Sequence, residues 1–178
     1  KAERGAARRL LAEESAAGRS NTLLYFSYGS CMCRLSFRES VPRYELIGAA
    51  RLPGYRLAFT ISSSRRGGGA ADIVEDPEGS VWGILYRIPR RYLLRLDERE
   101  GVFLGRYQRM QVRVHALGTT FEPVVTYSVV NKAATEIAPS SEYAGLIWDG
   151  ARGMLDATYC RRLAEQFQAF DVEPVCPV

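Results

Sequence analysis

Glu100 is the carboxylate whose position best suits proton transfer. It belongs to the acidic segment 96–102 (LDEREGV) and is followed at once by Gly101, where we expect a helix to end. A side chain at such a helix exit can turn inward into an apolar pocket. Burial there would raise the pKa of its carboxyl toward the range useful for proton transfer near pH 7. Carboxylates at helix ends are more often solvated, and the pattern by itself makes Glu100 a candidate and no more.

The turn Tyr28-Gly29-Ser30-Cys31 is a second place where this sequence could do chemistry. It follows the apolar run 23–28, which predicts a buried strand, and it leads into a predicted short helix over 31–38. Glycine lets the backbone approach a ligand closely, and amides at a helix start stabilise an anion or a carbonyl oxygen. An ordinary strand-to-helix connection would have the same sequence pattern.

His115 is the one histidine of the chain, which excludes every site that needs two imidazoles. It lies on the polar side of the alternating segment 106–115, where we expect it to be solvated. An enzyme of this composition would therefore work with carboxylates, backbone amides and tyrosines. Each tyrosine alone is more often structural. Six of the ten lie on or near expected strands and helix starts: Tyr25, Tyr28, Tyr86, Tyr107, Tyr127 and Tyr143.

The composition indicates one globular domain. The chain has 178 residues, 47% of them hydrophobic and 25% charged. The net charge of +4 falls by half outside residues 1–20, and the arginines are scattered, so a nucleic-acid surface is not indicated. We expect residues 1–20 to form a helical or disordered extension and residues 21–178 to form the domain. No apolar run reaches membrane-spanning length. The four cysteines lack CxxC spacing, which argues against zinc and favours reduced thiols in a cytoplasm.

The pattern along the chain predicts an α+β fold. About six short strands would form a closed or strongly curled, barrel-like sheet with helices packed outside. Pro53-Gly54 predicts a turn between strands over 44–50 and 55–61, and residues 76–79 predict a hairpin turn between strands over 71–74 and 81–88. Strands are also expected over 106–115 and 121–130. Helices are expected after Pro89, over 140–148 and over 155–170.

Four segments in this order resemble the γ-glutamylcyclotransferase family. Residues 24–32 (LYFSYGSCM) are similar to the family's YFAYGSNM signature, and residues 50–59 (ARLPGYRLAF) and 81–86 (VWGILY) resemble later family segments. The most specific match is residues 96–102, with Tyr107 seven residues after Glu100. Ser141-Glu142-Tyr143 and the last helix also fit, so the resemblance covers about residues 23–170.

The resemblance implies an enzyme that releases a γ-glutamyl group as 5-oxoproline, with no metal or cofactor. It implies Glu100 as the general acid/base and Tyr107 and Tyr143 as substrate-positioning residues, with Tyr127 as a weaker candidate. The resemblance implies an acyltransferase or a lyase-type enzyme that cyclises its substrate in glutathione metabolism. It also implies a homodimer. The leaving group stays open between an amino acid, an amine and a protected biosynthetic intermediate. The γ-glutamyl moiety would be held by Tyr25, Phe26, Ser27, Tyr28, Gly29 and Ser30.

Cys31 is the main departure from the family pattern, which usually has Asn there. Cysteine cannot supply the amide, so a weak or inactive γ-glutamyl-binding protein is the alternative. A thiol at a helix start would also have a lowered pKa and oxidise readily. An arginine-rich nucleic-acid or protein adaptor is a more distant third reading.

Overall fold

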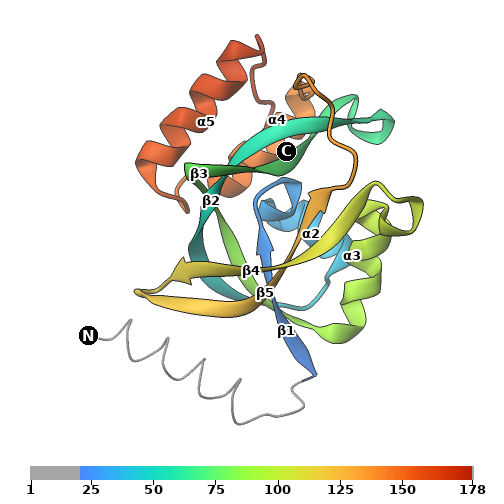
Figure 1. Cartoon of the computed structure of the whole chain (residues 1–178), viewed down its shortest axis with the longest axis vertical. Coiled ribbons are helices and arrows are strands. Elements are labelled where there is room, and N and C mark those ends of the chain that lie inside the picture. Colours follow the sequence, from blue (N-terminus) through green and yellow to red (C-terminus); the bar gives the residue numbers. More distant parts are fainter. Residues whose placement is uncertain (1–20, 178) are drawn as a thin grey trace.

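Five strands close into a barrel in the order β1-β3-β2-β4-β5, in a computed structural model that describes residues 21–177 (Figure 1). The α+β barrel with flanking helices is confirmed, with five strands rather than about six. β1 lies antiparallel to β3 and closes the barrel through a parallel contact with β5, at Tyr25 opposite Val125. The residues of the expected N-terminal extension, 1–20, lie outside the described part. The strands are β1 (Thr22–Ser27), β2 (Glu45–Ser63), β3 (Gly68–Pro89), β4 (Tyr107–Ala116) and β5 (Thr119–Val129).

β2 and β3 form one long hairpin, so two predicted turns are wrong. Pro53 pairs with Ser80 and Tyr55 with Glu75, so the ladder continues on both sides of Gly54. Gly54 absorbs the irregularity with a φ of +81°, and residues 76–79 form the extra length opposite it. The apolar residues beyond Gly54 are buried, so extending the pairing buries more apolar surface than a turn would. The true turn is the 3-10 helix Ser64–Arg66, which ends at Gly67 with a φ of +71°.

The helices lie largely where their end signals predict. The expected helix over 31–38 is split into a 3-10 helix (Ser30–Met32) and α2 (Arg34–Ser40), because Cys33 between them is extended. α3 (Leu93–Glu100) ends at Gly101, whose φ is +67°. α4 (Ser141–Ala151) and α5 (Ala157–Ala169) begin after Ser140 and Asp156, whose side chains accept hydrogen bonds from amides three residues on. None of the helices in the described residues is long and apolar enough to cross a membrane.

Aromatic side chains fill the core beside β1. The Phe37 ring of α2 stacks on Tyr86 of β3 at 4.3 Å and on Tyr25 of β1 at 5.7 Å. α5 packs against the far half of the long hairpin, where Phe59 of β2 meets Phe167 at 6.2 Å, and Figure 1 shows this helix alongside β2 and β3. The predicted stripe on α5 is confirmed, since Tyr159, Leu163 and Phe167 are buried. The stacked rings of α2 and β3 fix the position of β1 beside them.

Candidate active site

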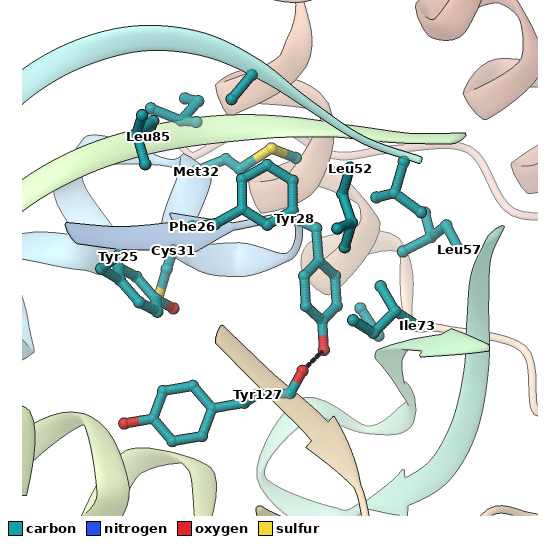
Figure 2. Packing of buried hydrophobic residues seen from close by; sticks show 14 of the residues in the cluster. Tyr25, Phe26, Tyr28, Cys31, Met32, Leu52, Leu57, Ile73, Leu85 and Tyr127 are labelled. Atoms are coloured by element: carbon teal, nitrogen blue, oxygen red, sulfur yellow. Dashed lines mark hydrogen bonds between the residues drawn. The ribbon is translucent and has the colours of Figure 1, made fainter. Parts of the chain in front are cut away.

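The structure gathers the predicted site residues around one cavity where β1 ends. Tyr25 and Ser27 point into it from β1, and Figure 2 shows Tyr25, Cys31 and Tyr127 around the same space. Of the residues proposed from the sequence, Phe26 alone does not line it. Phe26 is fully buried on the opposite face of the strand, because successive strand residues alternate. The lining residues are Tyr25, Ser27, Tyr28, Gly29, Ser30, Cys31, Ala71, Glu100, Tyr107, Thr126, Tyr127 and Tyr143.

Gly29 brings the backbone against the cavity wall. A Cβ at this position would lie 3.3 Å from the Ala71 Cβ and 3.5 Å from the Tyr143 hydroxyl oxygen. Any side chain here would crowd the space beside that hydroxyl. The glycine therefore keeps room for a ligand next to the first amides of the following 3-10 helix, which have no partners inside the helix.

Helix α3 carries Glu100 and is held on one side by Asp97. The Asp97 carboxylate is buried and accepts hydrogen bonds from Arg109 Nε at 2.8 Å and from the Tyr127 hydroxyl at 2.8 Å. Arg109 lies on β4 and Tyr127 on β5, so the helix is joined to two barrel strands. From the sequence, Asp97 was expected to be a solvated carboxylate near the end of the helix. Its burial fixes the face of α3 on which Glu100 lies.

Arg99 holds the same helix on its other side. Its side chain is only 5% exposed and donates to Ser36 Oγ at 2.6 Å, the Ser36 carbonyl at 2.7 Å and Ser30 Oγ at 3.2 Å. These contacts join α3 to α2 and to the turn that lines the cavity. A buried guanidinium therefore lies one residue from the candidate acid/base.

The Glu100 carboxylate faces the cavity without a partner. Within residues 21–177 it makes neither a hydrogen bond nor an ion pair. Asp97 and Arg99 of the same helix, in contrast, both have hydrogen-bond partners. Burial raises the pKa of this carboxyl above its usual range, while the charges of Arg99 and Arg66 oppose the rise. A group that transfers protons needs a pKa near the working pH and oxygens that no protein group occupies, and the Glu100 carboxylate has a raised pKa and no partner.

Backbone carbonyls fix two of the tyrosine hydroxyls that line the cavity around Glu100. Tyr28 donates to the Tyr127 carbonyl at 2.7 Å, a bond drawn in Figure 2, and Tyr107 donates to the Ala71 carbonyl at 2.7 Å. Tyr143 differs, because its oxygen accepts from the Ala71 amide at 3.0 Å and its proton stays available. Burial raises the pKa of Tyr143 to about 12, so this hydroxyl stays a donor at neutral pH.

Ser27 supplies a second unused polar atom. It is 2% exposed, and its Oγ has no hydrogen-bond partner in the described part of the chain. A buried hydroxyl without a partner is costly, typically about 1–3 kcal/mol, and a ligand group would relieve that cost. Residues 21–177 contain no group of three or more histidine, cysteine or carboxylate side chains that could hold a metal ion.

Comparison with known proteins places this chain in a family. Residues 80–163 match the AIG2-like family. Over 146 residues the chain is 38% identical to YkqA of Bacillus subtilis, whose name assigns it provisionally to the γ-glutamylcyclotransferases; the match covers 80% of this chain and 51% of YkqA. Human γ-glutamylcyclotransferase is 30% identical over 135 residues, covering 74% of this chain and 71% of the human protein. The chain belongs to the γ-glutamylcyclotransferase family.

Solved structures agree with this membership. One named gamma-glutamyl cyclotransferase superimposes with a TM-score of 0.76 at 29% identity, over 86% of this chain and 89% of that one. YkqA superimposes with a TM-score of 0.77 over 92% of this chain and 60% of its own. This γ-glutamylcyclotransferase-family chain thus spans between half and two-thirds of the length of YkqA.

Cys31 lines the cavity of this family member, but the expected low pKa of its thiol is wrong. The side chain is 3% exposed, and burial raises the pKa of the thiol despite the nearby Arg99. Cys31 lies inside the 3-10 helix Ser30–Met32, and a helix of only three residues provides little of the expected stabilisation. Cys31 is therefore a buried thiol beside the Tyr25 hydroxyl rather than a reactive thiolate.

Several side chains of this candidate site could not be chosen from the sequence. Tyr127 was a weaker candidate, yet it both lines the cavity and holds Asp97. Thr126 precedes it and donates to the Phe26 carbonyl at 2.9 Å. Arg66 and Arg99 were two among many scattered arginines. In the structure both contact Ser30 Oγ on the cavity wall, Arg66 at 3.4 Å and Arg99 at 3.2 Å.

Proposed function

We propose that this chain is a γ-glutamylcyclotransferase that converts a γ-glutamyl amide into 5-oxoproline and a free amine. The observation that carries the proposal is the unpartnered carboxylate of Glu100, with its raised pKa, in a cavity that also exposes the unpaired Ser27 hydroxyl. The family membership of the chain gives independent support.

The substrate supplies its own nucleophile in this reaction. Its α-amino nitrogen forms a bond to its γ-carbonyl carbon, and the bond from that carbon to the leaving nitrogen then breaks. Because the attack is intramolecular and closes a five-membered ring, proximity alone can contribute up to about 7–11 kcal/mol. The site therefore needs to hold a folded substrate and move one proton.

Glu100 is the group that moves this proton. An α-amine with a pKa of about 7.7–8.0 is largely protonated at pH 7 and must lose a proton before it attacks. Once that first proton has left to solvent, the amine attacks, and the Glu100 carboxylate accepts the second proton, which the nitrogen loses on ring closure. Glu100 then gives this proton to the leaving nitrogen, so the residue ends each turnover unchanged. A raised pKa suits both halves of the cycle, because the conjugate acid must be formed and then used.

The remaining cavity groups hold the γ-glutamyl moiety. The free proton of Tyr143 and the Ser27 hydroxyl can donate to carboxylate or carbonyl oxygens of the substrate. The amides after Gly29 provide further donors where negative charge develops on the γ-carbonyl oxygen. Tyr28 and Tyr107 form rigid walls, since backbone carbonyls fix their hydroxyls.

A second candidate is a γ-glutamyl-binding protein with little catalytic activity. Its support is the Cys31 side chain on the cavity wall, where the family signature usually has the amide of Asn. In that case the site would bind the substrate without orienting it for attack.

The test follows 5-oxoproline formation from a panel of γ-glutamyl amino acids, γ-glutamyl amines and glutathione. Glu100→Gln keeps the shape of the side chain and is expected to reduce kcat by about 10²–10⁴-fold. Glu98→Gln is the matched control, because Glu98 lies on the same helix but is exposed. Unchanged turnover in Glu100→Gln would sink the mechanism. Ligand binding without product from any compound would favour the second candidate.

A further inference from the structure

A second pocket opens directly from the catalytic cavity. It shares Ser30, Glu100, Tyr107 and Tyr143 with that cavity, so the two spaces meet at the proposed acid/base. Its other wall is strongly basic and is made by Arg65, Arg66, Arg99 and Arg106. When the γ-glutamyl moiety lies in the cavity, the leaving group on the far side of Glu100 would lie in this basic pocket.

Two of the four arginines are already engaged. Arg99 binds the serines of α2, and Arg65 lies 3.6 Å from the Glu39 carboxylate at the surface. Glu100 is the only carboxylate among the residues that line this pocket. The four guanidinium groups therefore face little negative charge.

Of the four arginines that line this pocket, Arg66 and Arg106 have no carboxylate partner among the described residues. Arg66 makes only a 3.4 Å contact with Ser30 Oγ and lies 5.4 Å over the Tyr143 ring. Arg106 donates to the Ser62 carbonyl at 2.7 Å. Both residues are partly buried. Each guanidinium has five N–H donors, so each keeps donors free for a carboxylate, which it can hold through two parallel bonds.

We propose that this pocket selects a leaving group with two carboxylates, so that the preferred substrates are γ-glutamyl peptides of glutamate or aspartate. The inference rests on the proposed function, because it assigns the leaving-group side of the same reaction. The leaving nitrogen must lie at Glu100, which returns the proton to it. The α-carboxylate of a leaving amino acid is two bonds from that nitrogen. An acidic side chain adds a second carboxylate, and both Arg66 and Arg106 keep donors and a positive charge with which to attract it.

The test compares γ-glutamyl-glutamate with γ-glutamyl-glutamine. The two compounds have the same shape, the same γ-glutamyl moiety and the same leaving α-carboxylate, and they differ only in the side-chain charge. We expect kcat/KM to be about 10- to 100-fold higher for γ-glutamyl-glutamate, the range expected for a charge-assisted hydrogen bond. Equal values in the wild-type protein would overturn the inference and leave a basic surface without a role in selection.

Substitutions show whether the two arginines cause the preference. Arg66→Gln and Arg106→Gln should each reduce the ratio severalfold, and Arg66→Lys should restore part of it because the charge returns. Arg161→Gln on the exposed face of α5 is the control and should not change the ratio. If a variant slows both substrates equally, the arginine binds a carboxylate that both share, and the inference is wrong for that residue.

A binding measurement separates this inference from the proposed catalysis. Calorimetry with both dipeptides, on the wild-type protein if it is inactive and otherwise on Glu100→Gln, reports selection without turnover. Tighter binding of γ-glutamyl-glutamate that depends on Arg66 supports the pocket even if no 5-oxoproline is ever formed. Equal binding of the two dipeptides overturns it even if turnover is observed. Thermal unfolding midpoints show whether each variant is folded.

Discussion

The Tyr127 hydroxyl donates a 2.8 Å hydrogen bond to Asp97 Oδ1, three residues before Glu100 on helix α3. Asp97 also pairs with Arg109, so a buried carboxylate with two partners orients the helix that carries an unpartnered one. The proposed acid/base is thus positioned by contacts that it does not make itself.

Tyr127→Phe should lower both stability and activity. It leaves one Asp97 oxygen with a partner fewer, and we expect a loss of about 1–2 kcal/mol in the free energy of unfolding. Urea denaturation measures this change. Tyr55→Phe is the control, because the Tyr55 hydroxyl makes no hydrogen bond within the described residues. Equal losses in the two variants would contradict a special role for the Tyr127 hydroxyl.

The stability of Glu100→Gln relative to the wild-type protein, measured as the free energy of unfolding, should increase as the pH rises. Burial raises the pKa of Glu100 in the folded state, so from its ordinary value of 4.5 up to the raised value the folded state binds more protons than the unfolded state. The wild-type protein therefore loses stability as the pH increases through this window, whereas the glutamine variant does not. Unfolding free energies from pH 4 to pH 8 check the sign. A pH-independent difference would mean that the Glu100 carboxyl is not desolvated.

Arg99→Gln should move the pH dependence of catalysis to higher pH. The Arg99 charge is the largest influence that opposes the raised pKa of Glu100, so its removal raises that pKa further. The acidic limb of the kcat/KM profile would shift upward, and stability would fall by about 1.5–3 kcal/mol as the serine contacts are lost. Arg95→Gln, on the exposed side of α3, should leave the profile unchanged.

Cys31→Asn should raise activity. It restores the amide that the family signature carries at the cavity wall, and one added hydrogen bond to the substrate would increase kcat/KM about 2- to 10-fold. The Tyr86 hydroxyl donates to the Cys31 carbonyl, which the substitution keeps. Cys33→Ala is the control, since Cys33 is buried but does not line the cavity. A loss of turnover would show that this chain has adapted its site to the thiol.

The salt dependence of the substrate preference offers a further prediction. Arg66 and Arg106 are only partly buried, so their attraction for an added carboxylate is partly screened by ions. The kcat/KM ratio of γ-glutamyl-glutamate to γ-glutamyl-glutamine should decrease between about 0.05 M and 0.5 M salt. The turnover of γ-glutamyl-glutamine serves as the internal control, because general salt effects act on both substrates. A ratio independent of salt would contradict an electrostatic origin.

The local features of this fold could be predicted from the residues of short segments. Gly101 predicts the end of α3 and so places Glu100 at a helix exit, and the apolar run before Gly29 predicts the strand that leads into the cavity. The alternation along β4 and the stripe on α5 also predicted correct elements. These signals work because helix ends, strand faces and turns depend on residues a few positions apart.

Features that depend on pairing between distant segments could not be predicted in this way and follow from the closed barrel. Pro53-Gly54 has the local chemistry of a turn, yet pairing of the flanking strands makes it a bulge inside a continuous hairpin. The Tyr143 hydroxyl meets the Ala71 amide across 72 positions, and Tyr28 meets the Tyr127 carbonyl across 99. Such contacts form because closing the barrel buries apolar surface, and the polar groups then pair with whatever the closure brings beside them.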